Sequence, residues 1–276
     1  MRTRTSLIRG ARALCVSTVA VLASTLPAAP ASAATLVVAC NETALRNAVT
    51  TANGTPASDT LDLAPGCTYG LTSELPAFTG PTIVNGAATV ITRTSGTFRI
   101  PTVNGGNLAL RSTTITNGDA SGSALVPGTG GGIVVTGNGV LTVTSSVIRG
   151  NRAGVGGGLR VFGGSRGQVT ASVVTANSAA QNGGGVFSDG DVTVNSSRVA
   201  GNTALGAGGG IANGLPSVAA GTAALNASSV TGNTATAGPG GIYDNGTAVT
   251  LRATRVVTNV PGNCAGSPNP VPGCVG

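Results

Sequence analysis

Apolar and polar positions repeat along this chain in a unit of eleven residues. The unit occupies residues 108–118, 141–151, 167–177, 192–202, 223–233 and 249–259. Its third and eighth positions are aliphatic in every copy, and apolar positions two apart are typical of short strands. The sixth position is always serine or threonine. Because a small hydroxyl side chain can hydrogen-bond its own backbone, this position predicts a bend between two strands.

A glycine cluster followed by an apolar residue precedes each unit from the second onward. The clusters are Gly130–Gly132, Gly156–Gly158, Gly183–Gly185, Gly208–Gly210 and Gly240–Gly241. They are 26, 27, 25 and about 31 residues apart. Repeats of this length are typical of solenoids, in which each repeat buries its apolar face only by stacking on its neighbours. We expect the glycines at corners where a side chain would collide with adjacent coils.

An asparagine closes five of the six units, whereas the first unit ends in Asn117-Gly118. The five residues are Asn151, Asn177, Asn202, Asn233 and Asn259. Asparagine tolerates the left-handed backbone region, and its amide can bond the same amide one coil away, at the strand spacing of about 4.8 Å. These columns predict an all-β fold, a right-handed parallel β-helix with an asparagine ladder. A twisted β-sandwich with frequent turns is the alternative.

Residues 1–33 have the pattern of a secretory signal peptide. Four arginines precede an apolar run from Ala13 to Leu26, and residues 31–33 supply a small-residue cleavage site. The run is too short to span a membrane, and no later segment is apolar for long enough to do so. Residues 37–40 resemble a lipoprotein cleavage site but lie far beyond the apolar run. We therefore expect export and release, with lipidation at Cys40 as the alternative.

The segment after the signal predicts a cap for the first coil. Asn41 can act as an N-cap, and apolar residues at helical spacing predict a short amphipathic helix over residues 41–53. The first coil of a solenoid exposes apolar side chains and strand edges, which such a helix would cover. We expect residues 54–80 to continue as irregular capping structure. Short β-type runs then follow from Pro81, at residues 83–84, 89–92 and 98–100.

Cysteine usage agrees with export. Cys15 lies in the signal, and four cysteines remain, which allow three pairings. Cys40 and Cys67 lie at one end of the predicted solenoid and Cys264 and Cys274 at the other, so we favour one disulfide at each end. A zinc site is the alternative, but the spacing fits no ribbon or finger and the chain has no histidine. The expected parts are a signal peptide (1–33), an N-terminal cap with a disulfide (34–80), the parallel β-helix (81–260) and a disulfide-stapled tail (261–276).

The repeats resemble those of polymorphic outer membrane proteins and of the wider group of secreted right-handed β-helix proteins. Such repeats pair a Gly-Gly-apolar motif, here Gly131-Gly132-Ile133 and its copies, with an aromatic-x-x-Asn motif. In this chain an aliphatic residue replaces the aromatic one, as in Ile148 to Asn151. Residues 40–53 are also similar to the cysteine-leucine-arginine capping segment of these secreted proteins. The resemblance covers residues 36–276 and implies a β-helix. We find no translocator segment and do not expect the adhesin role of autotransporter members.

Composition limits what the fold can contain. Aromatic residues are 2% of the chain, and tryptophan and histidine are absent from it. The core should therefore be thin and filled by small β-branched side chains. The formal charge of +7 falls to +3 without the signal arginines, because 11 arginines then face 8 carboxylates. That balance is too mild to predict contact with nucleic acid or an anionic membrane.

Polysaccharide cleavage is the main enzymatic alternative, because many β-helix proteins are lyases or hydrolases. A hydrolase needs paired carboxylates, and a lyase needs a base beside a calcium-bound uronate. Asp189 and Asp244 precede glycine-containing turns, and Asn213 occupies the matching place between them. That column is interpreted mainly as a turn. Two carboxylates with one coil between them would nevertheless lie about 10 Å apart, a separation that permits the geometry of an inverting hydrolase. We assign no catalytic residue, metal ligand or cofactor.

Charged and aromatic side chains on the strands supply candidate binding groups. Arg198 and Arg255 share the seventh position of the unit, and Arg111 and Arg252 share the fourth. We expect these arginines to point outward, either as solvated strand faces that discourage edge pairing or as contacts for an acidic glycan. Tyr243 lies near a strand that follows a glycine cluster and could stack on a sugar, although scattered aromatic residues more often pack internally.

These features predict an exported, non-catalytic β-helix that serves as a cell-surface, matrix or glycan-contact module. A polysaccharide lyase or glycoside hydrolase on a pectate-lyase-like β-helix is the alternative. We expect an extracellular bacterial protein with a Sec-type signal, a monomer whose partner is a polysaccharide or cell-surface component, without nucleic acid and without a membrane span. The candidate binding residues are Asp189, Asp244, Arg198, Arg255 and Tyr243.

Overall fold

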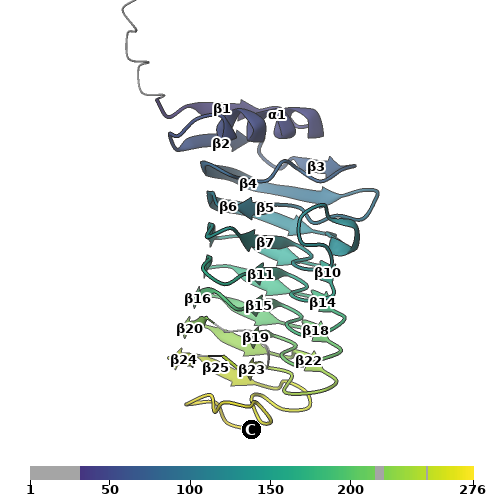
Figure 1. The fold of residues 1–276 in the computed structure, drawn as a ribbon, viewed down its shortest axis with the longest axis vertical. Helices are drawn as coiled ribbons and strands as arrows, with labels where there is room; N and C mark the ends of the chain where they lie inside the picture. Colours follow the sequence, from purple (N-terminus) through teal and green to yellow (C-terminus); the bar gives the residue numbers. More distant parts are fainter. Residues whose placement is uncertain (1–31, 215–220, 247) are drawn as a thin grey trace, which may run out of the picture. The chain divides into compact units, whose positions relative to one another are not determined.

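A parallel β-solenoid, with coils stacked along one axis, makes up the part of the chain that the computed structural model describes, residues 32–276 except 215–220 and 247 (Figure 1). The expected signal peptide lies outside the described residues apart from its last two. In the described ranges no helix combines the length and the hydropathy needed to cross a membrane. The all-β class and the short helix near the N-terminus confirm the predicted fold class.

Three parallel sheets run along the solenoid. The first contains β1 (Thr35–Val38), β2 (Asp59–Leu63), β3 (Thr68–Leu71), β4 (Pro81–Arg93), β6 (Asn107–Thr116), β8 (Val140–Thr144), β9 (Val147–Arg149), β12 (Arg166–Thr170), β13 (Val173–Thr175), β16 (Asp191–Asn195), β17 (Arg198–Ala200), β20 (Thr222–Asn226), β21 (Ser229–Thr231), β24 (Ala248–Arg252) and β25 (Arg255–Val257). The second contains β5 (Thr102–Asn104), β7 (Ile133–Thr136), β11 (Leu159–Val161), β15 (Val186–Ser188), β19 (Ile211–Asn213) and β23 (Ile242–Asp244). The third contains β10 (Arg152–Ala153), β14 (Ser178–Ala179), β18 (Thr203–Ala204) and β22 (Thr234–Ala235).

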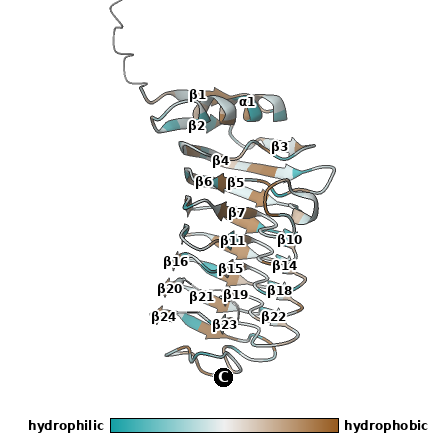
Figure 2. Ribbon diagram, viewed as in Figure 1, coloured by the Kyte–Doolittle hydropathy of each residue, from teal (hydrophilic) through white to brown (hydrophobic). Residues whose placement is uncertain are grey.

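Inward aliphatic side chains form a continuous thin core. Val143, Val169 and Val194 occupy the same register position in successive coils and are fully buried. Hydrophobic segments recur from coil to coil along the strands in Figure 2. The predicted bend is also present, because Ser145 and Ser196, each just before the sixth position of its unit, have φ values of 49° and 46°. The bend therefore recurs at the same place in each coil.

The predicted capping helix is α1 (Glu42–Asn53). Asn41 is its N-cap, because Oδ1 of Asn41 accepts a hydrogen bond from the backbone N–H of Ala44 at 2.8 Å, and the helix buries Leu45 and Val49. Residues 54–80 are more regular than the sequence analysis expects. There β2 pairs with β1 and β4, and β3 pairs with β4. The alternating buried positions of β2 give the physical reason, since alternation suits a strand that lies on the core.

Residues 81–100 differ from the expected series of short runs. One strand, β4, passes through the first two runs, with a register shift near its middle. Phe98 and Ile100, expected in a third run, are buried in an irregular segment. Between them the fully buried Arg99 donates to the backbone carbonyl of Val126 at 2.7 Å. A buried guanidinium requires such acceptors, and backbone hydrogen bonds from Ile100 to Gly132 and from Asp119 to Phe98 also hold this irregular segment.

The five closing asparagines form a continuous amide ladder. Each Nδ2 donates to the Oδ1 one coil further on, at 2.9–3.0 Å, from Asn151 through Asn177, Asn202 and Asn233 to Asn259. Each of these acceptor oxygens also receives the backbone N–H of the preceding asparagine. The stacking that the repeat predicts is therefore present as a row of paired hydrogen bonds.

The left-handed residue of this corner is the one before each asparagine, which corrects the sequence analysis. The residues concerned are Gly150, Ala176, Gly201, Gly232 and Thr258, with φ between 53° and 63°. The asparagine side chain has to point inward to meet its neighbour, so the preceding residue makes the turn. The first unit follows the same rule, because Asn117 has a φ of 61° and the N–H of Gly118 donates to Oδ1 of Asn151 at 2.8 Å.

The glycine clusters form the next corner of each coil. The first glycine of each of the four three-glycine clusters has a positive φ, which is 66° at Gly156. A Cβ on Gly157 would lie 2.3 Å from the carbonyl oxygen of Ser178 and 2.5 Å from that of Gly184. Both oxygens belong to the next coil, so the stacked backbone leaves no room for a side chain. This contact is the reason predicted for glycine at these positions.

Two disulfides close the ends of the described solenoid. Cys40 pairs with Cys67 and Cys264 with Cys274, with Cα–Cα distances of 5.8 and 6.2 Å. This is the predicted pairing. All four cysteines of the described residues are therefore engaged with one another, and Cys40, the candidate lipid acceptor, is one of them.

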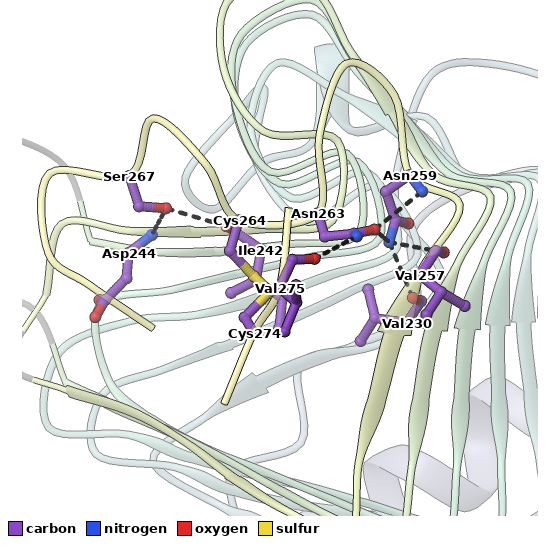
Figure 3. The surroundings of a disulfide bond; sticks show 10 residues. All are labelled: Val230, Ile242, Asp244, Val257, Asn259, Asn263, Cys264, Ser267, Cys274 and Val275. Atoms are coloured by element: carbon purple, nitrogen blue, oxygen red, sulfur yellow. Dashed lines mark hydrogen bonds between the residues drawn. A yellow bond between two sulfur atoms is a disulfide. The ribbon is translucent and has the colours of Figure 1, made fainter. Parts of the chain in front are cut away.

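The asparagine ladder ends beside the second disulfide. Oδ1 of Asn263 accepts from Nδ2 of Asn259 at 3.0 Å, and Nδ2 of Asn263 donates to the carbonyl oxygen of Val275 at 2.7 Å (Figure 3). The disulfide holds the chain that carries Val275 close to this last rung. The tail thus supplies the partners that a further coil would supply elsewhere.

Candidate binding groove

A second ladder, made of hydroxyl groups, fixes the bend between the two strands of each unit. The backbone N–H of Ser146 donates to Oγ of Ser172, and the N–H of Ser172 donates to Oγ of Ser197, both at 3.0 Å. Oγ of Ser172 in turn donates to the carbonyl oxygen of Thr170 at 2.7 Å. These bonds satisfy backbone groups that the bend removes from the strands, which is the role predicted for the sixth position.

A groove of about 470 Å³ lies on the outer side of this bend and crosses three coils. We call it the bend groove, and its lining residues are 171–173, 196–198 and 227–229. Asn195 and Asn226 lie at the ends of the strands that enter the bend, and Nδ2 of Asn226 donates to Oδ1 of Asn195 at 2.8 Å. The bend continues into the last coil, where Ala253 has the same backbone conformation, with a φ of 49°.

Three arginines flank the bend groove and its continuation. Arg198 of β17 and Arg255 of β25 belong to one column, with Ser229 of β21 between them. Arg252 of β24 lies on the other side of the bend, in register with Asn226. All three arginines are exposed, as their alternation along the strands predicts. None of them forms an ion pair with a carboxylate of the described chain.

Asp189 and Asp244 do not share a column, contrary to the sequence analysis. Strand register aligns Ser188 with Asn213 and Asn213 with Asp244, so Asp189 lies one residue beyond the column. The corner between β15 and β16 contains only Asp189 and Gly190, whereas the preceding corner, between β11 and β12, contains four residues. Counted from the apolar residue after each glycine cluster, Asn213 and Asp244 are the third residue and Asp189 is the fourth, so matching the residues that precede the turn glycines displaces Asp189 by one position. The carboxylate pair that the enzymatic alternative requires is therefore absent from this column.

Asp189 instead forms a buried ion pair with Arg160, a residue that the sequence analysis missed. Nη2 of Arg160 lies 3.0 Å from Oδ2 of Asp189, and the two side chains are 7% and 6% exposed. The guanidinium carbon lies 4.3 and 4.1 Å from the ring centroids of Phe162 and Phe187, a cation–π arrangement. Burial raises the pKa of Asp189 and lowers that of Arg160, and their mutual attraction opposes both shifts. The strand register, which pairs Arg160 with Phe187, is the feature that could have identified this contact.

Asp244 has the turn role that the sequence analysis favours. Its Oδ1 accepts hydrogen bonds from Nδ2 of Asn213 at 3.0 Å and from the N–H of Gly246 at 2.9 Å. The residue is only 1% exposed. Tyr243, its neighbour in β23, is half-buried and in register with Ala212. Both residues belong to the second sheet, so the structure does not bring them together with the arginines of the first.

A second hollow, of about 480 Å³, crosses the outer face of the third sheet and reaches Leu205. Asp119 and Arg152 at its margin satisfy each other, with Oδ2 and Nη2 2.6 Å apart. Burial acts to raise the pKa of Asp119, but hydrogen bonds from Arg152 and Ser121 outweigh it and lower the pKa. Over the described ranges, three or more Asp, Glu, His or Cys side chains nowhere gather as a metal ion would require.

Comparison with known proteins assigns no family to this chain. It has no significant match to a protein-family model, to a curated protein or to a solved structure. Functional inference therefore rests on the residues of the solenoid and on the geometry of its grooves.

Proposed function

We propose that this protein is an exported, non-catalytic β-helix that contacts an acidic glycan along the bend groove. The observation that carries the proposal is the position of Arg198, Arg252 and Arg255, which are exposed and without carboxylate partners among the described residues. The groove crosses successive coils, so it follows the solenoid axis. That geometry suits a linear polymer on a cell surface or in a matrix.

The strength of single contacts favours a polymer over a small anion. An exposed ion pair contributes only about 0–1 kcal/mol, so one arginine would hold a single carboxylate weakly. Contacts with several sites on one chain act at a high effective concentration and together give much tighter binding. The amide of Asn226 and the hydroxyl of Ser229 can add hydrogen bonds to sugar hydroxyl groups.

The carboxylates considered for catalysis have structural partners. Asp189 is paired with Arg160, and Asp244 accepts bonds from Asn213 and Gly246. Both carboxylates are nearly buried, at 7% and 1% exposure. A glycosidase carboxylate must reach the scissile bond or its water, and these two groups are held by the protein itself. Their structural roles leave neither of these two groups free to act as the acid or base of a hydrolase.

Retention on immobilised acidic and neutral glycans, measured at increasing salt concentration, tests the proposal. We expect retention on acidic glycans only, and retention should fall with salt because exposed ion pairs are screened. Arg255→Ala should weaken binding about two- to fivefold, the effect of one exposed ion pair. The matched control is Arg166→Ala, which removes an exposed arginine of β12 at the strand end away from the bend.

Two outcomes would contradict the proposal. Equal weakening by Arg166→Ala and Arg255→Ala would mean that net charge, and not the groove, causes retention. Release of unsaturated, ultraviolet-absorbing products or of new reducing ends from the glycan would show lyase or hydrolase activity, and catalysis would then replace contact as the function.

We also propose export through residues 1–33 and kinship with polymorphic outer membrane protein repeats. Two disulfides support the first idea, because such bonds persist in oxidising compartments. The stacking of the Gly-Gly-apolar and aliphatic-x-x-Asn motifs at successive corners supports the second. Expression of the full chain in a bacterium should give an exported protein whose N-terminal residue is Ala34. Retention of the uncleaved chain in the cytoplasm would contradict export.

A further inference from the structure

The arginines beside the bend groove are two coils apart along one column. Arg198 and Arg255 are both in register with Ser229, which lies on the coil between them. Neighbouring parallel strands are about 4.8 Å apart, so the two arginine positions are separated by about 10 Å along the axis. A linear ligand in this column therefore meets two cations, Arg198 and Arg255, with one uncharged coil between them.

The last coil presents arginines on both sides of its bend. Arg252 and Arg255 are separated only by Ala253 and Thr254, and the bend at Ala253 places them on different strands. The Thr254 hydroxyl is engaged with the backbone carbonyl of Leu225 at 3.0 Å. Two guanidinium groups can therefore approach one carboxylate or sulfate of a ligand from opposite sides, which is a strong form of anion contact.

The coil between the arginines carries no charge beside the groove. Its two side chains there are Asn226 and Ser229, an amide and a hydroxyl. These groups can exchange hydrogen bonds with a neutral sugar but cannot neutralise a carboxylate. A carboxylate held at this level would lose part of its hydration without gaining a counter-ion, which costs free energy.

We propose that the bend groove selects linear acidic glycans in which charged and neutral sugar residues alternate, over glycans charged on every residue. The inference rests on the proposed glycan contact and specifies its ligand. One charged residue lies between Arg252 and Arg255, a neutral residue lies beside Asn226 and Ser229, and the next charged residue meets Arg198. A uniformly charged polymer places every second carboxylate against the uncharged coil.

Binding of two oligosaccharides of equal length tests this selection. One is a uniform oligouronate, and the other alternates a uronate with a neutral N-acetylated sugar. We expect the alternating ligand to bind at least about threefold more tightly, although it carries half the charge, because only it leaves no carboxylate at the neutral coil. Affinity that rises with total ligand charge would overturn the inference.

Ser229→Arg supplies the missing cation and should invert the preference. It should tighten binding of the uniform oligouronate about two- to fivefold and should not tighten binding of the alternating ligand, whose neutral sugar loses the Ser229 hydroxyl and gains no ion pair. Thr236→Arg, which adds the same charge at an exposed position just beyond β22, is the control and should change neither. An equal gain from both variants would overturn the inference.

Deletion of residues 203–233 changes the spacing without adding charge. It removes one coil, joins Asn202 to Thr234, and places the coil of Arg198 directly beside that of Arg255. The deleted protein should prefer the uniform ligand, and an unchanged preference would contradict charge spacing as the determinant. If the unaltered protein binds no acidic glycan at all, the proposed function itself is contradicted. Failure of the proposed function can therefore be distinguished from failure of the proposed charge spacing.

Discussion

At the scale of single residues, the closing asparagines are satisfied largely by the equivalent residues one coil away. Asn202 donates through Nδ2 to the carbonyl oxygen of Val174 and to Oδ1 of Asn233. Its Oδ1 accepts from the backbone N–H and from Nδ2 of Asn177. Four hydrogen bonds thus depend on one side chain, and removing it leaves groups of two neighbouring coils without partners.

Asn202→Ala should lower the free energy of unfolding by about 2–5 kcal/mol, because each buried group left unpaired costs about 1–3 kcal/mol. Asn226→Ala is the matched control. It removes a half-buried amide that bonds Asn195 at the groove, and it should cost less than about 1 kcal/mol. Equilibrium denaturation in urea measures both changes, and similar losses in the two variants would contradict the stabilising role of the ladder.

The Arg160–Asp189 pair gives a prediction with a pH dependence. Arg160→Met should lower the free energy of unfolding at neutral pH by about 3–5 kcal/mol, since it leaves the Asp189 carboxylate buried without its cation. Burial already raises the pKa of Asp189, and losing Arg160 raises it further. A raised folded-state pKa gives stability below the unfolded-state value that is lost as pH rises, so the deficit should shrink on acidification.

The double variant Arg160→Met/Asp189→Asn is the control for that prediction. It removes both charges, so it should recover most of the stability lost by Arg160→Met and should show no acid-dependent recovery. Denaturation midpoints at pH 7 and pH 5 make the comparison. A double variant as unstable as the single one would show that packing on Phe162 and Phe187, and not the ion pair, stabilises this region.

At the scale of elements, the features that could be predicted from the sequence are those that recur in every coil. The bend, the glycine corner and the asparagine ladder were predictable because the same contact is made in every coil and leaves the same residue type each time. Strands β2 and β3 occur once, so no repeated column marks them in the sequence. The position of Asp189 was missed because Asp189-Gly190 and Asn213-Gly214 match as turn dipeptides, whereas strand register places Ser188, and not Asp189, beside Asn213. Arg160 becomes conspicuous only when register places it beside Phe187.

Glycines at the two corners of the coil, the glycine-cluster corner and the asparagine corner, should respond differently to an added methyl group. Gly157→Ala should cost at least about 3 kcal/mol, because its Cβ would meet carbonyl oxygens of the next coil at 2.3 and 2.5 Å. A Cβ on Gly232 would have no neighbouring atom within 4 Å. Ala176 and Thr258 adopt the same backbone conformation in the matching position of other coils, so Gly232→Ala should cost about 1 kcal/mol. Thermal unfolding separates the two variants, and equal shifts would contradict stacking as the reason for glycine.

The capping helix should lose its anchor in acid. The Glu42 carboxylate accepts hydrogen bonds from Arg46, Thr72 and Ser73; burial acts to raise its pKa, but these bonds outweigh burial and lower it from 4.5 to about 2. A depressed pKa gives stability above the unfolded-state value that is lost as pH falls towards the folded-state value. The wild-type protein should therefore lose stability relative to Glu42→Gln between pH 4.5 and pH 2. Parallel unfolding curves across that window would contradict this role of Glu42.

At the scale of the whole solenoid, each coil contacts only its neighbours, so the ends are the places where unfolding begins. Removing the Cys40–Cys67 disulfide, which closes a separation of 27 residues, should cost about 3–4 kcal/mol. Removing Cys264–Cys274, with a separation of 10, should cost about 2–3 kcal/mol. Hydrogen exchange should show faster opening of the strands next to the lost disulfide and little change in β12 and β16. Uniform acceleration along the chain would contradict opening from the ends.

The asparagine ladder has a consequence for how such a chain can change over time. Each rung offers the same donor and acceptor to the rung before and the rung after it. An in-frame duplication of one repeat in the gene would therefore splice in without disturbing either terminus. Unequal crossing-over could therefore lengthen or shorten the solenoid by whole coils, and with it the length of polymer that the molecule contacts. No new interface between coils would be needed.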